Sequence, residues 1–321
     1  MPARIAIIGA GNLGARHLQS LARLDADVVV DVVDPSQVAR TRSIDLLREV
    51  GGLRRGSLNV VDDVRQIAKA PDLAIVATNS VERPQIVSAL VQAGTPTMIL
   101  EKVLFTNLQA YDDVETMLAE AGTKAWVNCG SRFSPRAVDL VGMLGVKPLD
   151  YKVEGAGWGL GCNVIHHLDE FALLTGCNDV ALSADGLDDG IIPSKRAGYI
   201  EFTGTLKGLS ADGSRFSASC EPGVFSGREV TINANGVSVK ISQMRQTLTI
   251  SDSKGTRTEP YPIPLQSEVT AQHVMDILAG RQPALPDYAT AARLHRAMLT
   301  AFLAHLRRSA GNPAIDECPI T

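Results

Sequence analysis

Three groups of residues in this chain combine side-chain type and spacing in a way that suits chemistry. The first is a glycine-rich turn, in which Gly9, Gly11 and Gly14 follow the pattern G-x-G-x-x-G. The first glycine of such a turn permits a tight bend, the second lets the backbone approach a pyrophosphate, and the third lets a helix pack close to a strand. Asp34 ends the next apolar run, where an acid can accept hydrogen bonds from ribose hydroxyls. This group predicts a dinucleotide site.

Five further residues are expected beside that site. Asn12 and Leu13 lie inside the turn, and the N-terminus of the helix that follows offers free N–H groups and a partial positive charge to phosphates. Thr78, Asn79 and Ser80 come at the end of the apolar strand LAIVAT. Because ligands of such sheets bind at the carboxyl ends of the strands, we expect these three residues to line the same cofactor.

The charge at position 34 bears on which dinucleotide binds. A carboxylate repels the 2′-phosphate of NADP, so Asp34 favours NAD. Pro35 and Ser36 follow it and bring no cation, but Arg40 and Arg42 are close enough in sequence to swing towards the site. The predicted cofactor is therefore NAD, and NADP stays open.

Lys102 forms the second group and is a candidate for the reacting end of the site. It follows Glu101 and a predicted strand over 97–100, at the sheet edge where doubly wound folds bind ligands. An ammonium there could hydrogen-bond a reacting oxygen and polarise it. The alternative is a surface lysine at the end of a strand.

The third group opens a predicted helix over 164–174. Oxidising an alcohol requires a base for the hydroxyl proton, and histidine titrates in the useful range. Adjacent helix positions lie about 100° apart, so only one of His166 and His167 is expected to face a substrate. Asp169 shares a face with His166, where it could orient the imidazole or bind a substrate hydroxyl. The alternative is that one histidine caps the helix or packs against the sheet.

Two more side chains have both a binding and a structural interpretation. Arg132 could meet a substrate hydroxyl, carboxylate or phosphate, or it could form a salt bridge between domains. Trp158 lies in a glycine-rich stretch and could stack on a sugar ring or pack in the core. The sequence does not choose between these interpretations.

The elements that must position these groups change in character along the chain. In the first part, apolar runs alternate with helical segments, which predicts a parallel sheet with helices on both faces. From 180 to 250, short β-rich runs are separated by Gly, Ser, Asp and Asn, which predicts an antiparallel sheet. Two helices are expected near 268–278 and 288–307. We place the two domains at 1–130 and 131–321.

The composition argues against several classes of protein. The 321 residues carry a net charge of −4, with an isoelectric point of about 5.9, whereas nucleic-acid binders are more often basic. No apolar run reaches the roughly 18 residues of a membrane span, and the first strand starts too early to leave room for a signal peptide. The five cysteines have no C-x-x-C or zinc-finger spacing, so no metal is predicted. We expect a reduced, cytoplasmic protein with no nucleic-acid or membrane partner.

Four blocks of sequence resemble the glucose–fructose oxidoreductase / inositol dehydrogenase / MocA (Gfo/Idh/MocA) family, over nearly the whole chain. They are similar to the family's opening turn, its block ending in Glu-Lys-Pro, its Arg-Phe-x-Pro strand and its Asp-x-x-x-His-x-x-Asp helix. The blocks are GAGNLGARHL (9–18), AIVATNSVERPQIVSALVQAGTPTMILEKVL (74–104), WVNCGSRFSP (126–135) and GLGCNVIHHLDEFALLTG (159–176).

The resemblance implies an α/β fold, with an N-terminal Rossmann doubly wound parallel sheet and a C-terminal α+β domain built on an open, mostly antiparallel sheet. It implies NAD(P)-dependent hydride transfer at a hydroxyl or keto carbon of a sugar, sugar nucleotide or cyclitol. It also implies a homodimer or homotetramer that pairs through the C-terminal sheet. By the same resemblance Lys102 matches the catalytic lysine, Glu101 lies near the nicotinamide ribose, and His166 is the catalytic histidine.

Three positions depart from the family pattern. Val103 replaces the proline after the lysine, Arg83 replaces a histidine, and Cys162 stands where the family often has an aspartate. A thiol cannot stabilise an imidazolium as a carboxylate does, and the neighbouring Asn163 could orient the histidine but carries no charge. We do not expect Cys162 to be a nucleophile, because no activating base is evident beyond the adjacent histidines.

Three functions agree with these residues. The leading hypothesis is a sugar oxidoreductase in which Lys102 polarises the reacting oxygen and His166 relays the proton. The second is an enzyme that uses NAD only transiently, as in oxidation followed by elimination. The third is a non-catalytic dinucleotide-binding regulator or partner subunit, which the missing aspartate and proline motivate.

Overall fold

The computed structural model describes residues 1–134, 136–145 and 148–321. Pro135, the last residue of the block WVNCGSRFSP, lies outside these ranges. The chain forms two compact units: unit 1 is Met1–Phe105, Gln109–Asn128 and Pro264–Ala289, and unit 2 is Thr106–Leu108, Cys129–Ile263 and Thr290–Thr321. The domain boundaries at 130 and 131 stay a prediction.

Unit 1 is built on a parallel sheet, as its alternating pattern predicts. In the described chain this sheet has six strands in the order β3-β2-β1-β4-β5-β6. Their bounds are Ala3–Ile8 (β1), Val28–Val33 (β2), Gly56–Val61 (β3), Leu73–Val76 (β4), Thr97–Leu100 (β5) and Lys124–Val127 (β6). The strand order reverses direction between β1 and β4, which are paired in parallel. The carboxyl ends of strands at such a switch point form the ligand-binding crevice of doubly wound folds.

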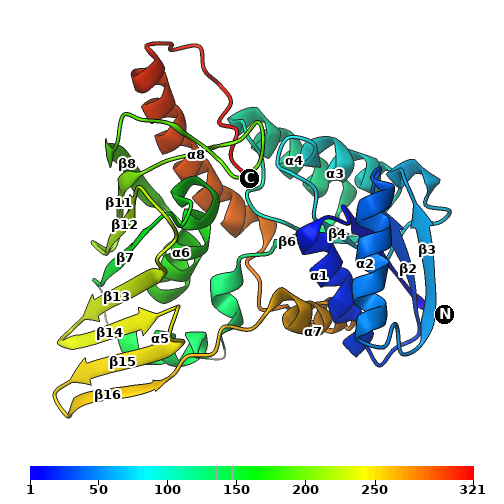
Figure 1. The fold of residues 1–321 in the computed structure, drawn as a ribbon, viewed down its shortest axis with the longest axis horizontal. Coiled ribbons are helices and arrows are strands. Elements are labelled where there is room, and N and C mark those ends of the chain that lie inside the picture. The colour runs from blue at the N-terminus through cyan, green and yellow to red at the C-terminus, as the bar shows by residue number, and fades with distance from the viewer. Residues whose placement is uncertain (135, 146–147) are drawn as a thin grey trace. The chain divides into compact units, whose positions relative to one another are not determined.

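Helices cover both faces of this sheet (Figure 1), with α1 and α2 on one face and α3 and α4 on the other. Their bounds are Asn12–Ser20 (α1), Gln37–Glu49 (α2), Arg83–Gln92 (α3), Leu108–Ala121 (α4) and Gln266–Leu278 (α7), with short 3₁₀ turns at Leu21–Arg23 (η1) and Val64–Gln66 (η2). The late helix α7 packs beside α1, where the Ala271 N–H donates to Ser20 Oγ at 3.0 Å. A segment far along the chain therefore completes unit 1.

Unit 2 is built on a mixed, mostly antiparallel sheet. Within the described residues the sheet has eight strands in the order β16-β15-β14-β13-β7-β12-β11-β8, and β7 and β12 are its one parallel pair. Its strands are Asp150–Ala156 (β7), Val180–Leu187 (β8), Gly204–Ser210 (β11), Arg215–Glu221 (β12), Arg228–Ala234 (β13), Val237–Ser242 (β14), Thr247–Asp252 (β15) and Gly255–Pro260 (β16). A separate two-stranded pair is formed by Ile192–Pro193 (β9) and Ile200–Glu201 (β10).

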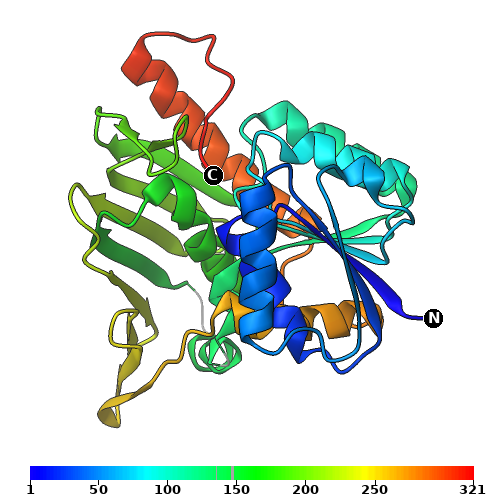
Figure 2. The same ribbon diagram turned by 45° about the vertical axis from the view of Figure 1, so that its right-hand side comes forward.

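One face of the unit 2 sheet is buried under helices (Figure 2). The helices of this unit are Ala137–Leu144 (α5), Leu160–Thr175 (α6) and Tyr288–Ala310 (α8), with a 3₁₀ turn at Gly130–Phe133 (η3). Burial alternates along β12, where Phe216, Ala218 and Cys220 are buried and their neighbours are partly or fully exposed. Phe216 packs edge-to-face against Phe171 of α6, with ring centroids 5.6 Å apart. This packing fixes the orientation of α6, the helix that carries the histidine pair.

Candidate functional site

The candidate residues gather in two places, which we name and treat separately. The cofactor edge lies in unit 1 and consists of Gly9–Gly14, Asp34, Thr78–Ser80 and Glu101–Lys102. The α6 face lies in unit 2 and consists of the side chains of Arg132, Trp158, Asn163, His166 and Asp169.

The glycines of the turn have three different surroundings. Gly9 has a φ of +92°, and a Cβ added there would lie 2.9 Å from the carbonyl carbon of Ala77. A Cβ added at Gly14 would lie 1.7 Å from the carbonyl oxygen of Gly9, so the helix can approach the strand only because this residue is glycine. At Gly11 no atom of the described residues lies within 4 Å of such a Cβ. Gly11 therefore faces open space at the start of α1, where a phosphate can approach the helix N-terminus.

Asp34 is joined directly to this turn. One carboxylate oxygen accepts a hydrogen bond from the Ala10 N–H at 2.7 Å, and the other accepts from the Ser36 N–H at 2.8 Å. A carboxylate has about four acceptor sites, so these bonds leave capacity for ribose hydroxyls. The Arg40 guanidinium donates to the backbone carbonyl of Asp34, and Arg42 donates to Asn12 Oδ1 at 2.5 Å. Both arginines therefore lie beside the adenosine end of the expected cofactor site.

Thr78 and Asn79 carry unsatisfied polar atoms. Thr78 Oγ1 and Asn79 Oδ1 are buried and have no hydrogen-bond partner among the described residues. Their backbone follows β4 beside the glycine turn, since a Cβ on Gly9 would lie 3.0 Å from the Thr78 N atom. A buried polar atom without a protein partner costs about 1–3 kcal/mol unless a water or a ligand binds it. These two atoms fit a dinucleotide that lies across the edge of the sheet.

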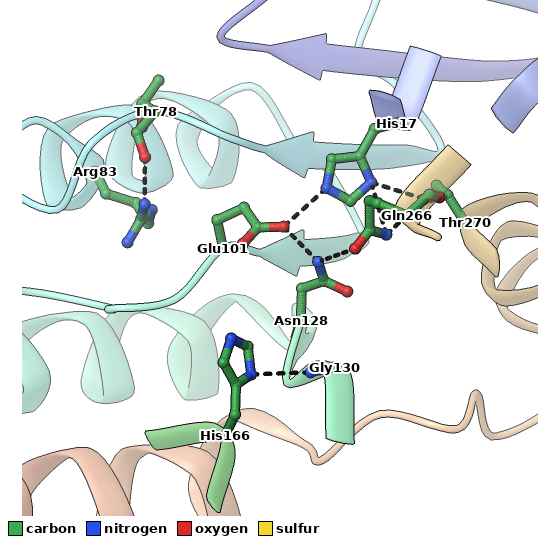
Figure 3. A network of polar contacts seen from close by, with 9 residues as sticks. All are labelled: His17, Thr78, Arg83, Glu101, Asn128, Gly130, His166, Gln266 and Thr270. Atoms are coloured by element: carbon green, nitrogen blue, oxygen red, sulfur yellow. Dashed lines mark hydrogen bonds and ion pairs between the residues drawn. The ribbon is translucent and has the colours of Figure 1, made fainter. Parts of the chain in front are cut away.

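Glu101 lies at the centre of a buried hydrogen-bond network (Figure 3). Glu101 Oε1 accepts from Asn128 Nδ2 and lies 2.8 Å from His17 Nε2, and His17 Nδ1 lies 2.8 Å from Thr270 Oγ1. Gln266 Oε1 in turn accepts from Asn128 Nδ2 at 2.8 Å. Burial raises the pKa of Glu101, but the hydrogen bond from His17 and the charges of His17 and Lys102 outweigh it, so that the pKa is lowered. The carboxylate beside Lys102 is therefore held in its charged form.

The sequence assigned no role to His17, Asn128, Gln266 or Thr270. His17 appears within the family-like opening block, but its partner at position 270 is 253 residues away along the chain. Nothing in the spacing of these residues marks them as neighbours. The network exists because α7 packs against α1.

Lys102 is half-buried immediately beyond β5, and its peptide bond to Val103 is cis. The buried guanidinium of Arg83 lies close by, with 1% of the residue exposed. It donates to the backbone carbonyls of Val103 and Thr78, and to that of Leu104 at 2.8 Å. Arg83 thus ties the segment after Lys102 to the segment that carries the unsatisfied atoms, as Figure 3 shows for its bond to Thr78.

On the α6 face, His166 is half-buried and held by a backbone group. Its Nδ1 accepts a hydrogen bond from the Gly130 N–H at 3.0 Å (Figure 3). His167 is buried in the core instead, with Nδ1 2.8 Å from the hydroxyl of Tyr151. Burial lowers the pKa of His167 well below its usual range, so this ring is neutral. The packing interpretation therefore describes His167.

Asp169 and Arg132 pair with each other. Arg132 donates from Nε and Nη2 to the two carboxylate oxygens, both at 2.7 Å, in the bidentate arrangement of a strong ion pair. Asp169 is fully buried, and burial raises its pKa while the guanidinium lowers it, with burial the larger effect. This salt bridge lies within unit 2, whereas the structural interpretation of Arg132 placed it between domains.

Asn163 and Trp158 are engaged in the fold of unit 2. Asn163 Nδ2 donates to the Trp158 carbonyl at 2.7 Å and to the Gly159 carbonyl at 3.2 Å, at the start of α6. Trp158 is 4% exposed and donates from Nε1 to the Ser219 carbonyl at 2.9 Å. The guanidinium of Arg228 lies over its ring, 5.7 Å from the centroid. These contacts agree with the core-packing interpretation of Trp158.

The start of α6 has an unusual cap. Glu201, from β10, accepts hydrogen bonds from the Gly161 N–H at 2.7 Å and from the Cys162 N–H at 3.2 Å. A carboxylate at a helix N-terminus is favoured by the helix dipole. Glu201 therefore caps the N-terminus of α6.

Two absences hold for the described ranges. In them no group of three or more His, Cys, Asp and Glu residues could hold a metal ion. No helix within them is both long enough and apolar enough to cross a membrane.

Comparison with known proteins finds a family model that matches part of this chain. Residues 3–129 match the family model described as "Oxidoreductase family, NAD-binding Rossmann fold", the Gfo/Idh/MocA family. The N-terminal part of the chain is therefore similar to this family. It is 27% identical over 205 residues to the myo-inositol dehydrogenase Hyg17 of Streptomyces leeuwenhoekii. That match covers 57% of this chain and 58% of Hyg17, so the chain spans less than two thirds of this relative.

Solved structures share the fold over almost the whole chain. UDP-N-acetylglucosamine 3-dehydrogenase GnnA from Acidithiobacillus ferrooxidans has a TM-score of 0.72 at 18% identity, covering 95% of this chain and 97% of GnnA. An oxidoreductase from Agrobacterium radiobacter, solved with NAD+, L-tartaric acid and magnesium, has a TM-score of 0.71 at 14% identity, covering 98% of both chains. These likenesses confirm the predicted α/β fold in both of its parts.

Proposed function

We propose that this protein is an NAD(P)-dependent oxidoreductase that transfers a hydride to or from a hydroxyl or keto carbon of a sugar, sugar nucleotide or cyclitol. The unsatisfied oxygens of Thr78 and Asn79, next to the turn of Gly9, carry the cofactor part of this proposal. The substrate class is supported by relatives named for dehydrogenating myo-inositol and UDP-N-acetylglucosamine.

The cofactor edge supplies the binding groups. The N–H groups at the start of α1 would face the pyrophosphate, Asp34 the adenosine ribose, and Thr78 and Asn79 the nicotinamide half. When bound, the nicotinamide donates or accepts the hydride. Lys102 would hydrogen-bond the reacting oxygen and stabilise negative charge as it develops there. Glu101, ionised and hydrogen-bonded to His17, lies next to that lysine in sequence.

The α6 face supplies polar groups for the substrate. His166 would meet the reacting hydroxyl or keto oxygen, and we keep Arg132, Asp169, Asn163 and Trp158 as substrate-binding candidates. These four already have protein partners. Their contribution would be to shape the site and to offer the substrate those donor and acceptor atoms that their internal hydrogen bonds do not use.

The deciding experiment is a fluorescence titration with NADH and, in parallel, NADPH, read by energy transfer from Trp126 and Trp158. Micromolar binding of NADH, with weaker binding of NADPH, supports the proposal and leads to a screen of sugars, sugar nucleotides and cyclitols for NADH production. Absence of binding for both nucleotides by fluorescence and calorimetry contradicts it.

One observation favours a second candidate, a dinucleotide-binding regulator or partner subunit without turnover. The binding candidates of the α6 face are paired with one another or with the backbone, and Cys162 replaces an acid. Tight NADH binding with no turnover across the whole screen would favour this candidate. Trace NADH without net accumulation would instead indicate transient use of NAD.

The oligomeric state is a separate proposal. By family resemblance the protein would form a homodimer or homotetramer through the eight-stranded sheet of unit 2. Light scattering coupled to gel filtration tests it, and a monomer at micromolar concentration would contradict it.

A further inference from the structure

Arg228 is a cation on the sheet of unit 2 that lies on the face covered by α6. It is the first residue of β13, and because side chains alternate along a strand it shares a face with the buried Val230 and Ile232. Ile232 pairs with Tyr151, whose hydroxyl contacts α6. The guanidinium of Arg228 lies over the ring of Trp158, 5.7 Å from the centroid. Arg228 therefore adjoins the α6 face, and all of these residues belong to unit 2.

The guanidinium of Arg228 has few partners within the protein. Its Nε donates to Gln243 Oε1 at 2.6 Å, whereas Nη1 and Nη2 have no hydrogen-bond acceptor among the described residues. No carboxylate in the described ranges forms an ion pair with it. The guanidinium of Arg132, in contrast, binds both carboxylate oxygens of Asp169. Arg228 thus lacks the paired acid that Arg132 has.

The electrostatic surroundings of Arg228 leave its charge incompletely balanced. Burial lowers the pKa of the guanidinium, although arginine stays charged in proteins. The groups whose negative charges counter this effect are those of Tyr151, Cys162 and Glu170. Tyr151 is neutral, because burial raises its pKa well above its usual value, and Glu170, with its pKa raised to about 7, carries only part of a charge at neutral pH. A bound anion would supply the charge that these groups do not.

The free donors of Arg228 suit one carboxylate. Because Gln243 holds Nε, the N–H groups that remain are on Nη1 and Nη2, which can donate in parallel to both oxygens of a carboxylate. The side chain is only partly buried, so a ligand can reach it. Arg132, the arginine of the α6 face, is already neutralised by Asp169, so the site offers a single guanidinium. One positive charge matches a carboxylate rather than a phosphate dianion.

We propose that Arg228 binds a carboxylate of the substrate, so that the protein acts on sugar acids or on nucleotide sugars whose sugar carries a carboxylate. This inference deepens the proposed function and rests on it for the sugar class, whereas the anion site itself belongs to unit 2 alone. Gln243 is a positioning residue, because its amide fixes the guanidinium and leaves the Nη1 and Nη2 donors to the ligand.

The first test compares ligands that differ in the carboxylate. The full chain is titrated by calorimetry, with and without NAD+, using D-glucuronate against D-glucose, D-galacturonate against D-galactose, and UDP-glucuronate against UDP-glucose. We expect at least one acid to bind about tenfold or more tightly than its neutral counterpart, as a charged hydrogen bond would provide. Equal affinities within every pair, or no binding of any acid, overturns the proposal. Tighter binding of D-glucose 6-phosphate than of all the acids overturns the assignment to a carboxylate.

Variants of Arg228 test whether the guanidinium provides this preference. Arg228→Met should weaken binding of the acid by about tenfold or more and change binding of its neutral counterpart by less than about threefold. Arg228→Lys should lie between Arg228→Met and wild type, because an ammonium keeps the charge but not the paired donors. Arg245→Met, in the exposed turn between β14 and β15, is the matched control for loss of one charge and should bind as wild type does. Equal losses for the acid and its neutral counterpart in folded Arg228→Lys would mean that Arg228 has only a structural role.

A substitution at Cys162 tests the same charge from the helix side. The charge of this residue acts on the Arg228 guanidinium, so Cys162→Asp would place an internal carboxylate in competition with the ligand. We expect Cys162→Asp to weaken binding of the acid by about tenfold or more, whereas the uncharged Cys162→Ser should bind it as wild type does. Unchanged affinity for the acid in folded Cys162→Asp would mean that the acid binds away from Arg228, and would overturn the proposal.

NADH production distinguishes failure of this inference from failure of the proposed function. Wild-type protein that reduces NAD+ with neutral sugars but with no sugar acid would keep the proposed function and overturn the carboxylate site. Binding of a sugar acid that Arg228→Met abolishes, without NADH production from any substrate, would support the carboxylate site and count against the proposed function.

Discussion

The cofactor edge and the α6 face were both recognised by residue type, yet their polar atoms differ in how many protein partners they have. On the cofactor edge, two buried oxygens lack a partner among the described residues, and Gly11 faces open space. On the α6 face, Arg132 and Asp169 bind each other, and the Asn163 amide binds backbone carbonyls. The first region is incomplete without a ligand, whereas the second is largely satisfied by its own residues.

This difference separates two kinds of polar residue. An unsatisfied buried atom destabilises the fold until a water or a ligand binds to it, so it can take a ligand. A buried ion pair with good geometry points to a structural requirement that a substrate can adjoin but not replace. The predictions below try to break this contrast or to sharpen it, beginning with the largest effect.

Lys102→Met should lower turnover by about 10²–10⁴-fold, the range associated with loss of a positioned proton donor. Methionine keeps the length of the side chain but removes the charge, so NADH affinity by fluorescence should change by less than threefold. Lys124→Met, at an exposed position on β6, is the matched control and should retain wild-type rates. If Lys102→Met turned over within tenfold of the wild-type rate, Lys102 would not be the reacting group of the cofactor edge.

Arg132→Met should destabilise unit 2 by about 3–5 kcal/mol, because it leaves the buried carboxylate of Asp169 uncompensated. The double variant Arg132→Met, Asp169→Leu should recover much of this loss, since neither charge then remains. Urea unfolding of the two single variants and the double variant gives the coupling energy as a double-mutant cycle. Additive losses would mean that the pair is not a structural unit, and the contrast between the two regions would fail.

How far the sequence predicts each region follows from the same contrast. The turn of Gly9 to Gly14, the acid at position 34 and the strand ends are local patterns, and the strands and the helix around them lie where these patterns predict. The pairing of Arg132 with Asp169 joins residues 37 positions apart, and the residue types did not predict it: they gave Arg132 either a substrate contact or a salt bridge between domains.

Other contacts had no local signal at all. Arg83 was noted as a departure from the family pattern, but its bonds to the carbonyls of Thr78 and Val103 depend on the path of two loops. The sequence identifies the chemistry of a side chain. Which partner occupies the donors and acceptors of that side chain depends on tertiary packing.

Asp169 and Glu170 are both buried acids of α6, and the titration of Glu170 tests whether it also has a structural role. Its pKa is raised to about 7, because the effect of burial and of the Asp169 charge exceeds that of the hydrogen bond from Tyr151, which lowers it. The folded protein therefore binds a proton more tightly than the unfolded chain does. Stability must fall as pH rises from the unfolded pKa of about 4.5 to the folded one, by roughly 3 kcal/mol.

Glu170→Gln should remove that dependence. Wild type should lose stability relative to the variant between pH 5 and pH 8, and His167, whose lowered pKa acts in the opposite direction, is present in both proteins. Urea midpoints at the two pH values provide the measurement. Parallel pH dependence in the two proteins would show that the Glu170 carboxyl titrates at an ordinary pKa in the fold.

Two glycines of the turn allow structural and ligand-binding roles to be compared within the cofactor edge itself. Gly14→Ala should cost about 1–3 kcal/mol or more, because its Cβ would meet the Gly9 carbonyl oxygen at 1.7 Å. Gly11→Ala should leave the unfolding midpoint within the range of a surface change, since its Cβ meets no described atom within 4 Å, but it should weaken NADH binding. Thermal unfolding and NADH titration of both variants form a matched pair. Equal NADH affinity in Gly11→Ala and wild type would mean that no pyrophosphate approaches the turn there.

Asp34 gives the smallest and most specific effect. Asp34→Ser removes the charge that repels a 2′-phosphate while keeping a hydroxyl near the Ala10 N–H that the carboxylate now binds. Arg40 and Arg42 already lie beside the turn, so a phosphate would find cations without any rebuilding of the site. We expect the ratio of NADH to NADPH affinity to fall by about tenfold, equivalent to about 1.4 kcal/mol. Arg42→Gln in the same background should reverse part of the gain for NADPH. An unchanged affinity ratio would mean that other residues determine the choice of cofactor. The carboxylate of Asp34 would then have a structural role, like the internally paired groups of the α6 face.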